Sequence, residues 1–153
     1  ELKIPRGDAA NFIEAYFSQY PGVRKFMNKT VAAAEESGYV YSLRGHRRFV
    51  PGIGSRNKTE KAGAERVAIN TPVQGSAADI VKQAMIDLDT RLKKEETEAK
   101  LLLQVHDELI LEVKTEEVDR ISRIVREVMQ SAISLSVPLK VSLETGESWG
   151  AVH

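Results

Sequence analysis

The chain has 153 residues, 42% hydrophobic and 29% charged, a composition typical of a globular protein that is long enough to bury a core. It has no cysteine, which excludes disulfides and thiolate metal sites, and no apolar run reaches the roughly 18 residues that a membrane span needs. The 22 basic and 22 acidic residues cancel, so net charge alone does not indicate a nucleic-acid-binding protein.

The start of the chain predicts two helices joined at a proline. Apolar side chains recur at helical spacing between Gly7 and Gln19, and Asp8 is a candidate N-cap. Pro21 breaks this pattern, because a proline disfavours the helical conformation in the residue before it. A second helix is therefore expected from Gly22 to Glu36, with Gly38 as its C-terminal stop.

A small hairpin and a basic loop are expected next. Residues 39–43 and 48–50 read as short strands, with Gly45 at the turn between them. The stretch from Arg44 to Arg66 has seven Lys or Arg against two Glu, a local charge of +5 over 23 residues. Such a stretch can steer a polyanion, and a solvated, mobile loop explains it equally well.

The second half predicts a compact α+β layer. A helical pattern extends from Ala62 to Glu95, with an interruption at Pro72, and residues 101–113 read as two buried strands around a tight polar turn. Thr115 is expected to cap a further amphipathic helix, and residues 139–143 alternate like a third strand. We expect helices to cover one face of an antiparallel sheet, beside a mainly helical first half.

The polar turn, His106-Asp107-Glu108, is poorly explained by folding alone. Neither Asp nor Glu favours strands, and a carboxylate near a core must be paired, hydrated or bound to a metal. Mg²⁺ takes oxygen ligands and often uses only one or two protein carboxylates, and two such ions about 3.5–4 Å apart serve phosphoryl transfer. On the residues alone, the alternative is that both acids are ordinary turn residues.

A second polar feature is the series Arg66, Asn70 and Gln74, which recurs at intervals of four. If the backbone stays helical across Pro72, the three side chains share one face of the helix. Amides donate and accept at once, which suits base edges in a minor groove, and Arg suits a phosphate or a base edge. Capping and packing at a kinked helix start is the alternative.

Two ordered motifs carry a resemblance to a known family. Residues 66–79, RVAINTPVQGSAAD, and residues 104–109, QVHDEL, closely resemble the family A DNA polymerases of the bacterial DNA polymerase I type. The resemblance covers essentially the whole chain, from Ile4-Pro5 to Gly146-Glu147-Ser148-Trp149. It implies the C-terminal part of the fingers subdomain in residues 1–60 and the C-terminal part of a palm, with its antiparallel sheet, in residues 61–153.

The resemblance also implies roles at the polar turn. Asp107 is then a catalytic residue and a ligand of two catalytic Mg²⁺ ions, which it shares with an aspartate that this chain does not contain. Glu108 lies beside it and tunes the metal site, and His106 lies near the primer 3′ end.

Nucleic-acid contacts are implied elsewhere in the chain. The residues Arg66, Asn70 and Gln74 are expected to contact the primer–template, largely through the minor groove. Arg47 and Arg48, with the loop around Arg56, are expected to lie at the edge of the fingers along the template strand. The family usually has Arg where His46 stands, so this sequence departs from the pattern there.

The implied function is template-directed DNA synthesis, in which dNTPs are added to a primer 3′ end in replication or repair. The implied location is the bacterial cytoplasm, at the nucleoid, and no membrane partner is expected. The family's motifs A and B are absent from these 153 residues, which begin with Glu1. We therefore expect a C-terminal piece that needs the N-terminal part of the polymerase and is inactive alone.

Two alternatives differ in class. The first is a nucleic-acid-binding module, or the complementing half of a split polymerase. The second is a relative of the single-subunit RNA polymerases, which share a related palm. Glu108 directly after Asp107 favours the DNA enzyme.

Overall fold

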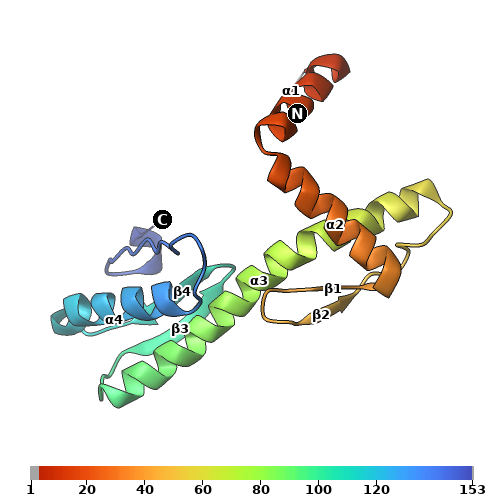
Figure 1. Ribbon diagram of the computed structural model, residues 1–153. Coiled ribbons are helices and arrows are strands. Elements are labelled where there is room, and N and C mark those ends of the chain that lie inside the picture. Colours follow the sequence, from red (N-terminus) through yellow and green to blue (C-terminus); the bar gives the residue numbers. More distant parts are fainter. Residues whose placement is uncertain (1–3, 153) are drawn as a thin grey trace. The chain divides into compact units, whose positions relative to one another are not determined.

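A computed structural model describes residues 4–152, so residues 1–3 and 153 of the expected subdomain ranges lie outside the described part. The chain divides into two compact units, and the boundary between them in the sequence follows Gly75. The secondary-structure elements of both units, labelled in Figure 1, are α1 (Arg6–Gln19), α2 (Pro21–Ser37), β1 (Tyr39–Tyr41), β2 (Arg47–Phe49), α3 (Lys58–Lys94), β3 (Lys100–Val105), β4 (Glu108–Glu112), η1 (Thr115–Glu117), α4 (Val118–Ser131) and η2 (Trp149–Ala151). The predicted α+β class is confirmed.

The two N-terminal helices form as predicted, except at the cap of the first. Pro21 occupies the first turn of α2, and Gly38 ends that helix in the left-handed conformation with φ 76°. Asp8 does not cap α1, so that prediction was wrong. The N-cap is Pro5, which has extended backbone angles. Asp8 lies inside the first turn, where its negative charge interacts favourably with the positive end of the helix dipole.

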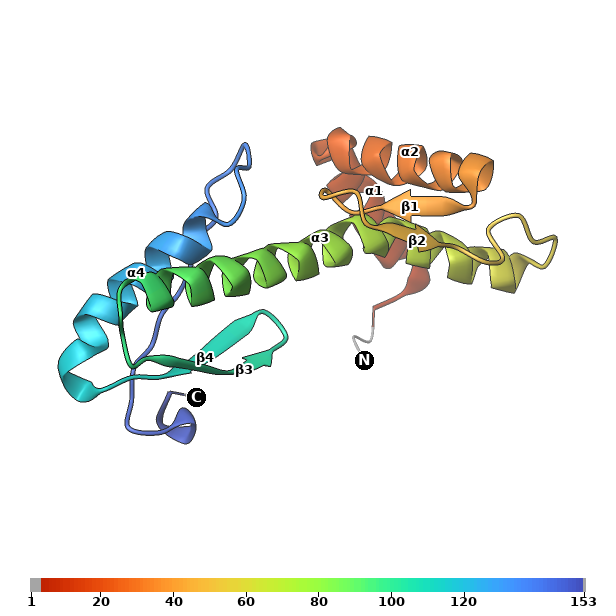
Figure 2. The ribbon, with the colours of Figure 1, turned by 90° about the horizontal axis from the view of Figure 1, so that it is seen from below.

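The β1–β2 hairpin packs between α2 and the first part of α3 within the first unit (Figure 2). Tyr39 pairs with Phe49, Val40 with Arg48 and Tyr41 with Arg47. Most side chains of the core below it are small, which lets helices and hairpin approach closely. The core consists of Ala34, Val40, Val50, Ile53, Ala64 and Ala68.

Helix α3 is longer than predicted at its start and does not break at Pro72. Asn57 caps it, because its Oδ1 accepts from the backbone N–H groups of Thr59 at 2.9 Å and Glu60 at 3.4 Å. A proline inside a helix costs about 3 kcal/mol, but buried residues on both sides of Pro72, such as Ala68 and Leu88, hold both segments helical. The predicted interruption was therefore wrong, since tertiary packing outweighs the local preference.

The second unit places two helices on one face of the β3–β4 hairpin, as predicted (Figure 2). Its core joins the C-terminal half of α3 to α4 through Leu88, Leu92, Ile121, Ile124, Val125 and Val128. Leu109 and Leu111 of β4 pack against this cluster. The register shifts between Leu101 and Leu103, which leaves one extra residue on β3.

Two predictions in the C-terminal third were wrong. Thr115 does not cap α4: it starts a short 3-10 turn, and α4 begins at Val118 without a side-chain cap. Residues 139–143 form no strand, because within the described residues the ladder of the second unit contains only β3 and β4. Leu143 packs against the helical core instead, so the alternating pattern serves burial without a sheet partner.

Ion pairs close the open end of the β3–β4 hairpin. Lys114, just after β4, lies 2.7 Å from Glu98, just before β3. Arg120 of α4 donates to the backbone oxygen and to Oε2 of Glu95, both at 3.0 Å, and Arg91 donates to Oε1 at 2.9 Å. The hydrogen bond from Arg120, followed by that from Arg91, holds the pKa of Glu95 below its usual range. These contacts fix the end of α3 against α4, which supports the hairpin.

Candidate functional site

The turn of the β3–β4 hairpin displays three exposed polar side chains. Val105 pairs with Glu108, so His106 and Asp107 are the two residues of the turn. His106 has φ 55°, and Asp107 does not share this left-handed conformation. Gln104 donates from Nε2 to the backbone oxygen of His106 at 3.0 Å, which holds the turn from the strand side. Asp107 therefore stands at the tip of a short, well-supported loop.

His106 is strained, since a positive φ at the first residue of a two-residue turn is normally taken by glycine. A residue other than glycine in this region costs on the order of 1–3 kcal/mol, and such residues cluster at functional sites. The sequence gives no reason for histidine at this position in terms of folding alone. The conformation thus supports a functional reading of the turn.

We expect His106→Gly to be more stable than His106→Ala by about 1 kcal/mol, because only glycine adopts this φ without a steric penalty from Cβ. Equilibrium unfolding in urea, on the two variants of the intact protein, measures the difference. The matched control is Glu112, in β4, where φ is ordinary and Ala should be more stable than Gly. An alanine variant at His106 as stable as the glycine variant would rule out strain at the turn.

The carboxylates of the turn fit part of a magnesium site. Asp107 and Glu108 are adjacent and exposed, and their oxygens are the ligand type that Mg²⁺ prefers. Within residues 4–152, no three His, Asp or Glu side chains come together as a possible metal site. Because Mg²⁺ often binds through one or two carboxylates, with water and substrate phosphates as its other ligands, the pair fits a site completed from elsewhere.

A cavity of about 750 Å³ adjoins the turn within the second unit. Asp107 and Glu108 line it together with apolar residues of α3, β4 and α4. The C-terminal segment also contributes, through Leu143 and Trp149. No pattern in the sequence predicts that this segment lies near the turn. Its only signal was the Gly146-Glu147-Ser148-Trp149 motif at the end of the resemblance.

The series Arg66, Asn70 and Gln74 lies on one exposed face of α3 in the first unit. The helix is continuous through Pro72, as the sharing of one face by these three side chains requires. Residues four apart on a helix are neighbours, and the three side chains therefore form a polar stripe of donors and acceptors.

Arg47 and Arg48 lie on opposite faces of β2. Successive residues of a strand point to opposite faces, and β2 places Arg47 across from Tyr41 and Arg48 across from the buried Val40. The Arg47 guanidinium lies 4.5 Å from the centre of the Tyr39 ring. Both arginines are exposed, on opposite faces of the hairpin.

Comparison with known proteins gives consistent findings. A family model described as DNA polymerase family A matches residues 1–151. DNA polymerase I of Bacillus caldotenax is 55% identical over 148 residues, and DNA polymerase I of Bacillus subtilis (strain 168) is 48% identical over 148 residues. Each alignment covers 97% of this chain and 17% of the relative, so the chain spans about a sixth of these proteins.

A solved structure is also similar. It is the POL domain of Pol1 from M. smegmatis in complex with DNA primer-template and dNTP, and it matches with a TM-score of 0.95 at 43% sequence identity. The match covers 99% of this chain and 27% of that chain. Within residues 4–152, no helix has the length and apolar character that crossing a membrane demands.

Proposed function

The chain belongs to DNA polymerase family A, and from this premise we propose that it forms the part of a template-directed DNA polymerase that carries one side of the metal site. The resemblance drawn from the two motifs is confirmed. The observation that carries the proposal is Asp107, exposed at the tip of a two-residue turn that Gln104 supports and whose strained histidine has no explanation in folding alone.

The proposed reaction is in-line attack of the primer 3′ hydroxyl on the α-phosphorus of a dNTP. A new P–O bond forms to the primer, the bond to the pyrophosphate oxygen breaks, and the proton of the hydroxyl is released to water as pyrophosphate leaves. Asp107 would hold Mg²⁺ at the turn, and the bound metal would promote the attack and stabilise the charge on the leaving oxygen. Asp107 supplies the main carboxylate ligand, Glu108 adjusts the charge beside it, and His106 presents its imidazole near the primer end.

The polar stripe of α3 would contact the minor groove of the primer–template. All four base pairs offer similar acceptors there, so donors such as Asn70 and Gln74 respond to the geometry of a pair and not to its sequence. Arg66 would add a phosphate or base-edge contact. Arg47 and Arg48 would bind different parts of the template strand, since they lie on opposite faces of the hairpin.

The remaining part of the polymerase is the proposed protein partner. The resemblance implies a second metal-binding aspartate that lies outside these 153 residues, and the chain spans only 17% of the relatives that it matches. The division into fingers before about residue 60 and palm after it stays a prediction, as does a place at the nucleoid in the bacterial cytoplasm.

Primer extension by the intact protein tests this function. A labelled primer annealed to a longer template should lengthen when dNTPs and Mg²⁺ are supplied, and the added sequence should follow the template. Equal extension with rNTPs would favour the RNA polymerase alternative. Binding of the primer–template without any extension would favour a module that only binds nucleic acid.

Gln74→Ala is expected to lower the rate of primer extension about tenfold, or to raise misincorporation by a similar factor, because a minor-groove hydrogen bond of about 1–1.5 kcal/mol is lost. Single-nucleotide incorporation with matched and mismatched dNTPs measures both effects. Thr90→Ala, at an exposed position of the same helix, is the control and should leave both unchanged. Unaltered rate and fidelity in Gln74→Ala would reject the minor-groove role.

A further inference from the structure

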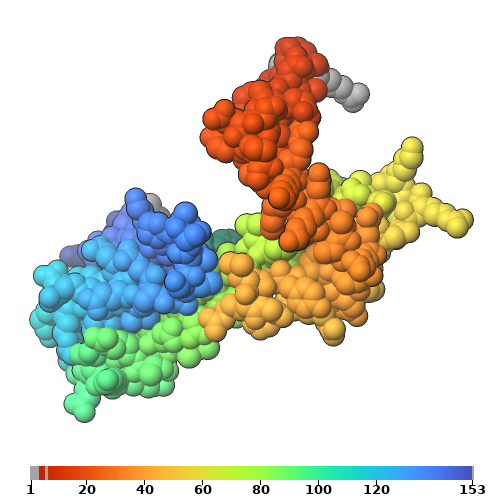
Figure 3. All heavy atoms as spheres, viewed as in Figure 1, coloured from red at the N-terminus to blue at the C-terminus, as the bar shows by residue number. Residues whose placement is uncertain are grey.

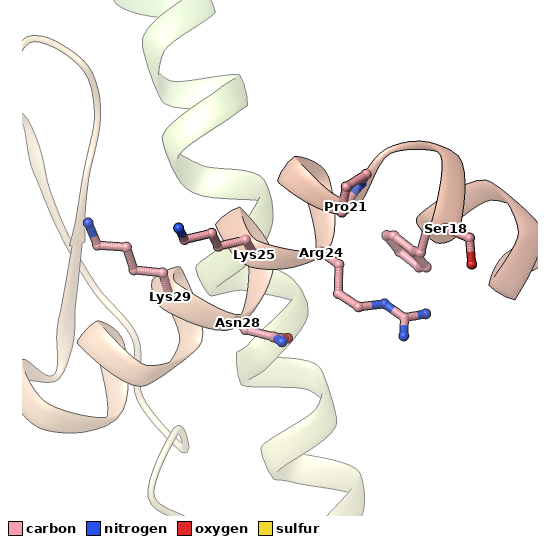
Figure 4. Close-up of a pocket in the computed structure, with 7 residues that line it drawn as sticks. Ser18, Pro21, Arg24, Lys25, Asn28 and Lys29 are labelled. Carbon is pink, nitrogen blue, oxygen red and sulfur yellow. The ribbon is translucent and has the colours of Figure 1, made fainter.

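A basic hollow lies where α1 meets α2 in the first unit (Figure 4). Its volume is about 630 Å³. Three cations and an amide of α2 line it together with the end of α1, and the residues are Phe17, Ser18, Pro21, Arg24, Lys25, Asn28 and Lys29. None of these residues belongs to the turn of the β3–β4 hairpin, to the polar stripe of α3 or to the β1–β2 hairpin. We call this feature the α1–α2 corner.

Arg24 is held in place at the corner. Its Nη2 donates to Oε1 of Glu14 at 2.7 Å, and its guanidinium lies 4.6 Å from the centre of the Phe17 ring. A guanidinium has five N–H donors, so one contact to Glu14 leaves others for a ligand. The side chain is therefore oriented before any ligand binds, which lowers the entropy lost on binding.

Lys25 and Lys29 are one helical turn apart, and Figure 4 shows both extending from α2 in the same direction. Neither forms an ion pair within the described residues. Between residues 10 and 30 the cations Arg24, Lys25 and Lys29 face a single acid, Glu14, which gives a local charge of +2. Two cations in a row along a helix suit successive phosphates of one strand.

Exposed aromatic rings lie beside Phe17, at the end of α1 that lines the corner. The rings of Tyr16 and Tyr20 are 5.1 Å apart, and those of Tyr16 and Phe17 are 5.5 Å apart. Tyr20 is 53% exposed and Tyr16 46% exposed, and Figure 3 shows the atoms of α1 standing clear of the rest of the first unit except at its junction with α2. Bases of a single strand stack on such rings, whereas a duplex keeps the faces of its bases covered.

We infer that the α1–α2 corner binds the sugar–phosphate backbone of single-stranded DNA, with a base stacked on Tyr20. The phosphate contacts come from Lys25 and Lys29 on one side of α2 and from Arg24, with the Asn28 amide, on the side that Figure 4 shows toward α1. The choice of DNA over RNA rests on the proposed function, while the recognition of a single strand rests on the corner itself. The proposed polymerase gains a strand contact that is separate from its primer–template residues.

The test measures binding of fluorescent (dT)12 to the intact protein by anisotropy over a range of salt concentrations. For Lys25→Gln/Lys29→Gln, the slope of log K against log salt should become shallower by about 1.4, which is about 0.7 for each lost phosphate contact. Tyr20→Ala should lower the affinity at least about fivefold with little change of slope. The control Lys93→Gln/Lys94→Gln removes the same charge from α3 and should match the unaltered protein.

Amine acetylation read by mass spectrometry locates the contact. Bound (dT)12 should protect Lys25 and Lys29 and leave Lys93 reactive. Equal salt slopes in the two double variants, or unprotected Lys25 and Lys29, would overturn the inference. Equal protection by poly-glutamate would also overturn it, in favour of an acidic protein partner. Primer extension is measured on the same samples, so loss of the corner and loss of polymerase function are separate results.

Discussion

If the proposed function holds, Asp107→Asn in the intact protein is expected to lower the rate of primer extension at least about a thousandfold. The amide keeps the shape of the side chain but removes the charge that we propose to bind Mg²⁺. A metal ion supplies several kcal/mol of transition-state stabilisation, and about 4 kcal/mol corresponds to a factor of about a thousand. Asp107 is exposed at the turn, so the fold should be unaffected. Single-turnover extension and thermal unfolding measure the two properties.

The control for this result is Glu112→Gln, which removes one charge from the other end of β4. Glu112 is exposed and is the last residue of β4, at the end of the strand that lies away from the turn. Its Oε1 lies 3.8 Å from Nζ of Lys100. Its extension rate should stay within about twofold of the unaltered protein, since an exposed ion pair contributes little. Near-normal extension by Asp107→Asn would contradict the assignment of Asp107 as a metal ligand. An equal loss in Glu112→Gln would show that only the overall charge of the hairpin matters.

Leu88→Ala is expected to destabilise the protein by about 3 kcal/mol. Leu88 has no exposed surface and packs in the core that joins α3 to α4 and β4. Removing its branched end loses hydrophobic transfer energy and leaves a cavity, and such changes cost about 2–5 kcal/mol. Because a domain is stable by only about 5–15 kcal/mol, the loss is large. Urea unfolding of the intact protein, monitored by circular dichroism, measures it.

Ile86→Ala is the control, because Ile86 lies two residues earlier on α3 and is 61% exposed. Its cost should stay below about 1 kcal/mol, since little apolar surface leaves the core. Leu88→Ala should also reduce primer extension, because the hairpin that carries Asp107 rests on this core. Equal destabilisation by the two variants would contradict the packing described for the second unit.

Local patterns predicted most of the elements. Apolar spacing located α1, α2 and α4, and the apolar strands around a polar triplet located the β3–β4 hairpin with its turn. These predictions succeed because each signal, such as Gly38 in the left-handed conformation, is contained within a few neighbouring residues. The cap at Asn57 was missed although its residue type is a regular helix start.

Other predictions failed where distant contacts decide the outcome. Pro72 favours a break, but the packing of residues far away in the sequence keeps α3 continuous. Residues 139–143 alternate like a strand, and a strand requires a partner edge that the sequence does not specify. Likewise, only the pairing of β1 with β2 shows that Arg47 and Arg48 face opposite sides.

The sequence by itself determined the order of the helices and hairpins, the family, and the residue types at the polar turn, because these depend on local pattern and side-chain chemistry. The tertiary structure decided how those residues are presented. It shows His106 strained at the turn, aligns Arg66, Asn70 and Gln74 across Pro72, and joins α1 to α2 in a basic corner. Each of these depends on backbone geometry and on packing between separate segments, which no local pattern contains.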